Sequence, residues 1–303
     1  MSLVRLNVMY GHLEGTEVKF ARDPSGYLSI EAGIYQRHGL EISWNHVQGT
    51  EERYRRLESG EAQISFVVGR ASLQHFLNTR STRVLGCAMN SCPYYLVADA
   101  AVGELRELKG KTVACREGPA RGVAFEKVFQ EQAGLKLGGD VTLKLPKSDQ
   151  ETFHLLIGGE VDAALLPRPY GFMAEEKGFK RIAAWPDVVD DPLPISIETT
   201  ARFATERAKD ISAFLVAHRE GVRYIKANRQ EAIRILAAKF GHSPALAART
   251  VEEYLVCMDE SLAVDFKRFE RLLSQVAPDK AGDARRIASE WIMPGALRGE
   301  HVP

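Results

Sequence analysis

Short β-prone segments alternate with amphipathic helical segments through the first 190 residues, and this alternation constrains the fold most. Apolar and polar residues alternate over residues 4–10 and 40–47, and apolar runs at 62–68 and 84–88 predict two further strands. Helical patterns fill the stretches between them. A strand–helix–strand order of this kind predicts a parallel sheet covered by helices.

The organisation changes at Asn90, where the sequence Asn-Ser-Cys-Pro interrupts the pattern. A strand over residues 94–98 then begins a second strand–helix series that continues to about residue 190. Residues 192–199 are extended and rich in proline, which indicates a return to the first unit, and the remaining pattern is helical. The sequence therefore predicts two α/β lobes, residues 1–92 plus 193–303 and residues 93–192.

Residues 108–122 combine a strand with a helix start. Residues 112–115 are β-prone, and Gly118 and Pro119 break the strand before a helix that stops at Gly134. Free backbone N–H groups at such a helix start favour an anionic or hydrogen-bond-accepting ligand. The alternative interpretation is an ordinary turn between strand and helix with no ligand.

The charge balance excludes several classes of partner. Forty basic residues match forty acidic ones among 303, so the formal net charge is zero and no basic stripe indicates nucleic-acid binding. No apolar run approaches the roughly 18 residues that a membrane helix needs. Cys87, Cys92, Cys115 and Cys257 show no metal-ligand spacing, and whether any of them pair stays open. We expect no metal and no cofactor, and a non-catalytic binding protein would have no catalytic residue.

Four stretches in order, residues 27–42, 57–64, 108–113 and 159–163, resemble one known family. The family comprises the solute-binding proteins of ABC importers for aliphatic sulfonates, taurine, nitrate and thiamine precursors, and the resemblance extends to about residue 275. It implies an α/β fold of the type II periplasmic binding protein kind, with two α/β lobes around a cleft and C-terminal helices on the first lobe. It also implies a monomer that delivers its ligand to a membrane permease, in the periplasm after removal of a leader.

The resemblance also locates the ligand in the cleft, at the first turns of helices from both lobes. By position, it assigns to the site Gly11, His12, Leu13, Gly49, Thr50, Gly69, Arg70, Asn90 and Ser91 from the first lobe, and Arg116, Gly118, Pro119, Ala120, Pro167 and Arg168 from the second.

The side chains of these residues suggest an anionic ligand. Arg116 follows a strand, where its guanidinium can clamp a carboxylate or sulfonate; a solvated or structurally paired arginine is the alternative. Arg168 lies between two prolines that fix its direction, whereas a plain surface residue is the alternative for Arg70. Tyr10, Tyr94 and Tyr95 permit an aromatic ligand, although strand tyrosines more commonly pack in a core.

Two functions of different classes fit this pattern. The first is a receptor that captures a sulfonate, carboxylate or pyrimidine-like molecule between its lobes without chemical change. The second is a cytoplasmic enzyme of the same fold, an aromatic-acid decarboxylase that uses His12 and the arginines, or a desulfinase-like lyase. The desulfinase branch of that fold needs a cysteine in the first loop, and residues 11–24 contain none. A cytoplasmic ligand sensor is a third alternative.

Overall fold

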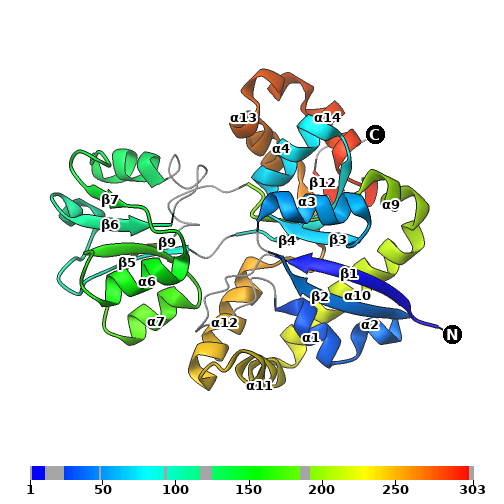
Figure 1. Cartoon of the computed structure of the whole chain (residues 1–303), viewed down its shortest axis with the longest axis horizontal. Helices are drawn as coiled ribbons and strands as arrows, with labels where there is room; N and C mark the ends of the chain where they lie inside the picture. The colour runs from blue at the N-terminus through cyan, green and yellow to red at the C-terminus, as the bar shows by residue number, and fades with distance from the viewer. Residues whose placement is uncertain are drawn as a thin grey trace.

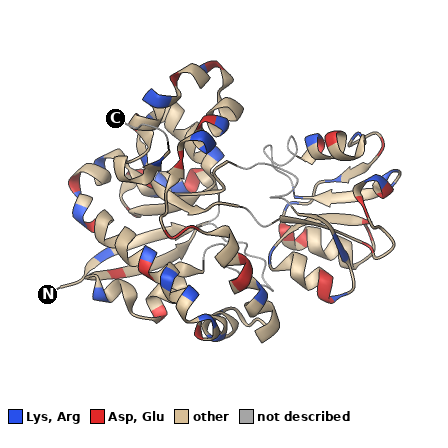
Figure 2. Cartoon of the chain, turned by 180° about the vertical axis from the view of Figure 1, so that it is seen from behind, with Lys and Arg blue, Asp and Glu red and all other residues tan. Residues whose placement is uncertain are grey.

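Two sheets of five strands each form the framework of the chain (Figure 1; seen from behind in Figure 2). The computed structural model describes residues 2–10, 24–47, 49–91, 94–116, 125–184 and 192–299. We call the part built on the first sheet the first lobe and the part built on the second sheet the second lobe. The lobe boundaries predicted above stay a prediction, because residues 92, 93 and 191 lie outside the described part.

The first sheet has the order β2-β1-β3-β10-β4. Its strands are β1 (Val4–Tyr10), β2 (Leu40–His46), β3 (Ile64–Val67), β4 (Thr82–Met89) and β10 (Ile195–Thr200). β1 pairs with β2 and β3 in parallel, as the strand–helix–strand order predicts. β10 is antiparallel to both β3 and β4 and separates them, so the four strands predicted to be parallel do run in one direction, but the sheet as a whole is mixed. The return segment lies inside the sheet, and its residues from Ile195 to Thr199 are buried although three of them are polar.

The second sheet has the order β7-β6-β8-β5-β9. Its strands are β5 (Tyr94–Ala98), β6 (Thr112–Cys115), β7 (Thr142–Lys144), β8 (Ala163–Pro167) and β9 (Lys180–Ala184). β6 is parallel to β7 and β8, whereas β5 is antiparallel to β8 and β9. This sheet therefore repeats the mixed arrangement of the first.

Helices cover both sheets. Those of the first lobe are α1 (Ser25–Glu31), α2 (Ile34–Arg37), α3 (Thr50–Ser59) and α4 (Gly69–Thr79), followed after β10 by α9 (Ala201–Glu206), α10 (Ala208–Ala227), α11 (Arg229–Phe240), α12 (Pro244–Cys257), α13 (Phe266–Val276) and α14 (Ala284–Trp291). The second lobe contains α6 (Asp149–Ile157), α7 (Tyr170–Glu176) and two shorter turns, Leu105–Leu108 and Phe129–Ala133. Two-residue strands, β11 (Val264–Asp265) and β12 (Leu297–Arg298), interrupt the C-terminal region that the sequence predicts to be all helical.

Two details of helix starts and ends differ from expectation. The pattern over residues 24–39 predicts one helix, but Gly33 adopts a φ of 64° and divides it into α1 and α2. Thr50 is expected to cap α3, yet the N-cap is Gly49, and no side chain caps this helix. Gly49 has a φ of 84°, a value that glycine adopts without steric cost.

The core of each lobe lies on both faces of its sheet. In the first lobe, α1, α2 and α10 pack on one face, and α4, α13 and α14 pack on the other around Trp291, Phe76 and Phe269. In the second lobe, α6 and α7 cover one face. Within the described residues, no helix combines the length and the apolar character needed to cross a membrane.

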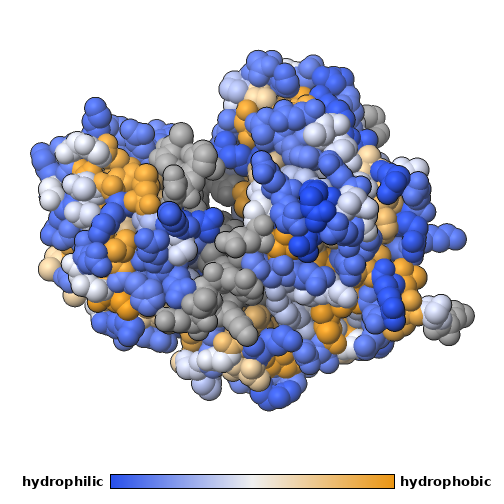
Figure 3. Space-filling model, in the orientation of Figure 1, coloured by the Kyte–Doolittle hydropathy of each residue, from blue (hydrophilic) through white to orange (hydrophobic). Residues whose placement is uncertain are grey.

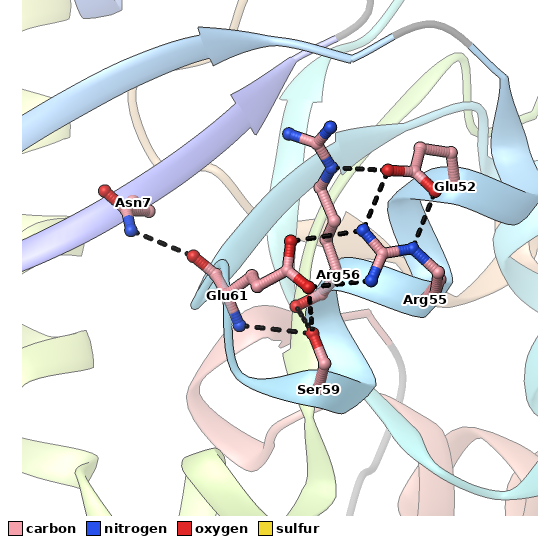
Figure 4. Close-up of polar contacts among 6 residues, drawn as sticks. All are labelled: Asn7, Glu52, Arg55, Arg56, Ser59 and Glu61. Carbon is pink, nitrogen blue, oxygen red and sulfur yellow. Dashed lines mark hydrogen bonds and ion pairs between the residues drawn. The ribbon is translucent and has the colours of Figure 1, made fainter.

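A surface network of charged side chains closes the turn between α3 and β3 (Figure 4). Arg55 donates to both Glu52 and Glu61, and Arg56 donates to Glu52. These contacts lower the pKa of Glu52 to about 2. Asn7 Nδ2 donates to the Glu61 carbonyl oxygen at 2.9 Å, which ties the turn to β1. Because the four charged side chains are 37–53% exposed, we infer that the network orders the turn and adds little to stability.

The start of α6 provides a first prediction. Ser148 Oγ accepts a hydrogen bond from the Glu151 N–H at 3.0 Å, while the Glu151 carboxylate accepts from the Lys147 N–H at 2.9 Å. The sequence Ser-Asp-Gln-Glu at residues 148–151 predicts a capping box, and only the first half of it forms. Ser148→Ala should lower the free energy of unfolding by about 1 kcal/mol, measured by urea denaturation. Ser274→Ala, in the last turn of α13 and exposed, is the matched control, and an equal loss there would contradict a capping role.

Candidate functional site

The carboxyl ends of strands from both sheets point toward the region between the lobes. Figure 1 shows β1 and β6 directed toward this region from opposite sides, and Figure 3 shows the surface hollowed between the lobes. Ligands of open α/β sheets bind beyond strand carboxyl ends. The predicted site residues within the described part all follow or end strands or begin helices there: Gly49, Thr50, Gly69, Arg70, Asn90, Ser91, Arg116, Pro167 and Arg168.

Arg116 is the predicted site residue whose environment best suits an anion. It directly follows β6, and its Nη1 donates to Asp149 Oδ2 at 3.0 Å. The Asp149 side chain is fully buried, whereas that of Arg116 is 35% exposed. Asp149 is the first residue of α6, so this helix start holds one edge of the guanidinium. A planar guanidinium fixed on one edge can present its other N–H groups to a carboxylate or sulfonate.

Arg168 has a different environment. Its side chain is 1% exposed, and its Nη1 donates to Glu253 Oε2 of α12 at 3.0 Å. Its Nη2 lies 3.9 Å from Met89 Sδ, at the end of β4 in the first sheet. Burial raises the pKa of Glu253 to about 8. Arg168 therefore links the second lobe to the first; a direct role in ligand binding stays a prediction.

The start of α4 is closely packed. Gly69 N–H donates to the Leu193 carbonyl oxygen at 3.0 Å, so this donor is already used within the protein. Arg70 is half-buried, and its Nη2 donates to Gln275 Oε1 of α13 at 2.7 Å. The structure thus places both residues beside the return segment and α13.

The end of β4 is held by two C-terminal helices. Asn90 N–H donates to the Cys257 carbonyl oxygen of α12 at 2.6 Å. Arg268 of α13 donates through Nη2 to the Asn90 carbonyl oxygen at 2.5 Å. Sequence reasoning missed Arg268, because nothing in a helical pattern 178 residues away indicates contact with this crossing.

A second missed arginine joins two strand ends. Arg53, in the first turn of α3, donates through Nε to the Val47 carbonyl oxygen at 3.1 Å and through Nη1 to that of Phe66 at 3.0 Å. Gly49 and Thr50, just before it, are exposed. In the sequence, the available signal is a basic residue one turn after a strand–glycine–helix junction.

Several predicted residues lie outside the described part of the chain: Gly11, His12, Leu13, Gly118, Pro119, Ala120 and the cysteine at position 92. Tyr10, Tyr94 and Tyr95 are buried, which agrees with their interpretation as core residues. Cys87, Cys115 and Cys257 are buried. In the described ranges, no group of three or more His, Cys, Asp or Glu side chains is arranged to hold a metal ion.

Comparison with solved structures identifies the fold. The periplasmic aliphatic sulphonate binding protein SsuA from Escherichia coli superposes with a TM-score of 0.71 at 16% identity, covering 96% of each chain. The alkanesulfonate-binding protein SsuA from Xanthomonas axonopodis pv. citri, bound to MOPS, gives 0.69 at 15% identity, covering 98% of this chain and 99% of that one. The Candida albicans CA3427 gene product, described as having the generic periplasmic binding protein fold, gives 0.67 at 15%, covering 99% of each. This chain has the same fold.

A family model gives a more specific result than the structural likenesses. No match was found among curated proteins. The model described as NMT1/THI5 like matches residues 25–232, which is more than two thirds of the chain. This chain therefore belongs to the NMT1/THI5-like family.

Proposed function

We propose that this protein is the solute-binding receptor of an ABC importer and captures a small organic anion between its two lobes. The lobes correspond to residues 1–92 plus 193–303 and residues 93–192. The receptor works in the periplasm as a monomer and presents its closed, loaded form to a membrane permease. The ligand carries a sulfonate or carboxylate group, or is a pyrimidine-like molecule that accepts hydrogen bonds from the same donors.

The setting of Arg116 carries this proposal. Its guanidinium is held by the buried Asp149 carboxylate, is one-third exposed, and follows a strand whose carboxyl end points toward the other lobe. A cation in this position can bind an anion reversibly without any further chemical group. The named functions of the Escherichia coli and Xanthomonas relatives, aliphatic sulphonate and alkanesulfonate binding, support the same ligand class.

The proposal is tested with defined compounds. Purified protein is mixed with ethanesulfonate, taurine, benzoate and an aminopyrimidine, and the unfolding temperature is recorded for each, since a ligand selective for the folded state stabilises it. Isothermal titration calorimetry then gives the affinity of any compound that raises this temperature. Nuclear magnetic resonance of the recovered compound must show it unchanged, because conversion to a product would identify an enzyme.

For the compound that binds, Arg116→Ala should weaken affinity by about 10- to 100-fold. A charge-assisted hydrogen bond contributes about 1.5–3 kcal/mol, which corresponds to this range. Calorimetry on wild type and variant provides the measurement. Unchanged affinity would remove Arg116 from the site.

The control must separate lost binding from lost stability, because Arg116→Ala leaves the Asp149 carboxylate buried beside a missing cation. The double variant Arg116→Ala, Asp149→Asn removes that charge as well. We expect it to recover stability, measured by urea denaturation, while affinity stays low. Recovery of affinity in the double variant would show that Arg116 acts only through Asp149.

A further inference from the structure

α12 is the one C-terminal helix that makes strong contacts with both lobes among the described residues. Figure 1 shows it at the edge of the first lobe nearest the second. Helical periodicity gives it two different faces. Leu246, Arg249 and Glu253 lie on one face and contact the second lobe, whereas Ala247, Val251 and Tyr254 lie on the other.

The face toward the first lobe is apolar. Ala247, Val251 and Tyr254 are fully buried in one cluster with Leu28 of α1 and Val222 of α10. Burying these side chains stabilises the contact by the hydrophobic effect, which acts at all times and does not depend on a matched partner charge. α12 is therefore a permanent part of the first lobe.

The face toward the second lobe is mostly charged. At its centre, Glu253 pairs with Arg168, which directly follows β8, and this contact is nearly closed to solvent. One turn earlier, the Arg249 guanidinium carbon lies 4.0 Å from the ring centre of Phe172 in α7, and the same guanidinium pairs with Glu175. Glu175 also accepts from Arg181 Nε at 2.7 Å, so both contacts are anchored in the second lobe.

Charged contacts of this kind separate more readily than apolar ones. When two lobes move apart, water enters and hydrates both partners of an ion pair, and this hydration offsets the loss of their attraction. Apolar side chains that become exposed gain no comparable hydration energy. The two faces of α12 thus combine one lasting attachment with one reversible attachment.

We infer that α12 is a latch between the lobes, and that the Glu253–Arg168 and Arg249–Glu175 pairs hold the second lobe at its resting angle. The latch acts in addition to the two chain crossings near residues 90 and 193. It goes beyond solute binding, because it fixes the resting arrangement in the absence of any ligand.

The test measures the distance between the lobes without ligand. Keto-bearing amino acids at the exposed positions Lys136 and Lys209, one in each lobe, are labelled for single-molecule energy transfer, which leaves the native cysteines untouched. In Glu253→Gln, we expect the ratio of molecules at the wild-type distance between the lobes to molecules at all other distances to fall about tenfold or more. Glu252→Gln is the matched control, since Glu252 is adjacent on the same helix and pairs with Arg229 of α11 in the first lobe; its distribution should match wild type.

A second variant keeps the test decisive if Glu253→Gln does not fold. Arg249→Gln removes the outer pair, whose arginine is 38% exposed, and should broaden the distance distribution to a smaller extent. If each of the variants Glu253→Gln and Arg249→Gln that folds has the same distance distribution as wild type, the inference is overturned. An equal change in Glu252→Gln would overturn it as well. Because no solute is present, failure here leaves the proposed function untouched, and failure of the binding assays leaves the latch untouched.

Discussion

As the pH rises from 5 to 8, the unfolding free energy of the Glu198→Gln variant should increase by about 2–3 kcal/mol relative to that of wild type. Glu198 lies on β10, between β3 and β4 in the first sheet, and its side chain is fully buried. Ser72 Oγ of α4 donates to its Oε2 at 2.5 Å. Glutamine keeps the shape and the acceptor oxygen but cannot ionise.

The direction of this effect follows from the pKa of Glu198. Burial raises it from 4.5 to about 7, against the smaller opposing effects of the Ser72 hydroxyl and the Arg53 charge. Between these values the unfolded chain releases a proton that the folded chain retains. The proton retained on Glu198 therefore stabilises the folded wild type fully below about pH 4.5. This stabilisation is lost as the pH rises through about 7. At about 1.4 kcal/mol per pH unit, the whole difference amounts to about 3 kcal/mol.

Urea denaturation of wild type and variant at pH 5, 6, 7 and 8 provides the measurement. Glu270→Gln, which changes an exposed glutamate on α13 in the same way, serves as the control and should follow wild type at every pH. A constant difference between Glu198→Gln and wild type across this range would show that Glu198 does not titrate there.

Gly69→Ala should lower the free energy of unfolding by about 2–3 kcal/mol or more. A Cβ at this position would lie 2.3 Å from the Leu193 carbonyl oxygen and 2.6 Å from Leu193 Cγ. Leu193 stands between Pro192 and Pro194, whose fixed φ angles limit how far its backbone can move away. The start of α4 and the return segment must therefore separate, and the hydrogen bond from Gly69 N–H to Leu193 is weakened with them.

The matched control for this variant is Gly295→Ala, because no atom lies within 4 Å of the Cβ it would add. We expect its unfolding free energy to stay close to wild type. Calorimetry with the compound that binds should also show weaker affinity in Gly69→Ala, since the variant displaces residues at the strand ends of the proposed site. If the two alanine variants have equal free energies of unfolding, the return segment moves away from the added Cβ without a loss of stability.

Local pattern was sufficient for most individual elements. The strand over residues 4–10 and the second-lobe strand over 94–98 form as predicted, because alternating or fully apolar runs of that length bury their side chains best as strands. The helix that ends at Gly134 and the Ser148 cap also form, since each depends on a single residue with a distinct local preference. Family membership was recognisable for the same reason, through short stretches in a fixed order.

Contacts between distant segments lay beyond local pattern. Nothing in residues 192–199 states that β10 enters the first sheet between β3 and β4, because that depends on which strand edges remain unpaired after the rest has folded. Arg168 is an example at the proposed site: its position after a strand between two prolines suggested a ligand contact, yet its guanidinium is buried against Glu253, 85 residues later.

The sequence by itself determined the elements, their order and the chemistry available at the strand ends, because periodicity and turn residues act within a few positions along the chain. Only the tertiary structure decided which charges face a partner and which face solvent. Arg116 and Arg168 look alike in sequence, and the difference between them arises from Asp149 and Glu253, which the fold brings to each from another helix.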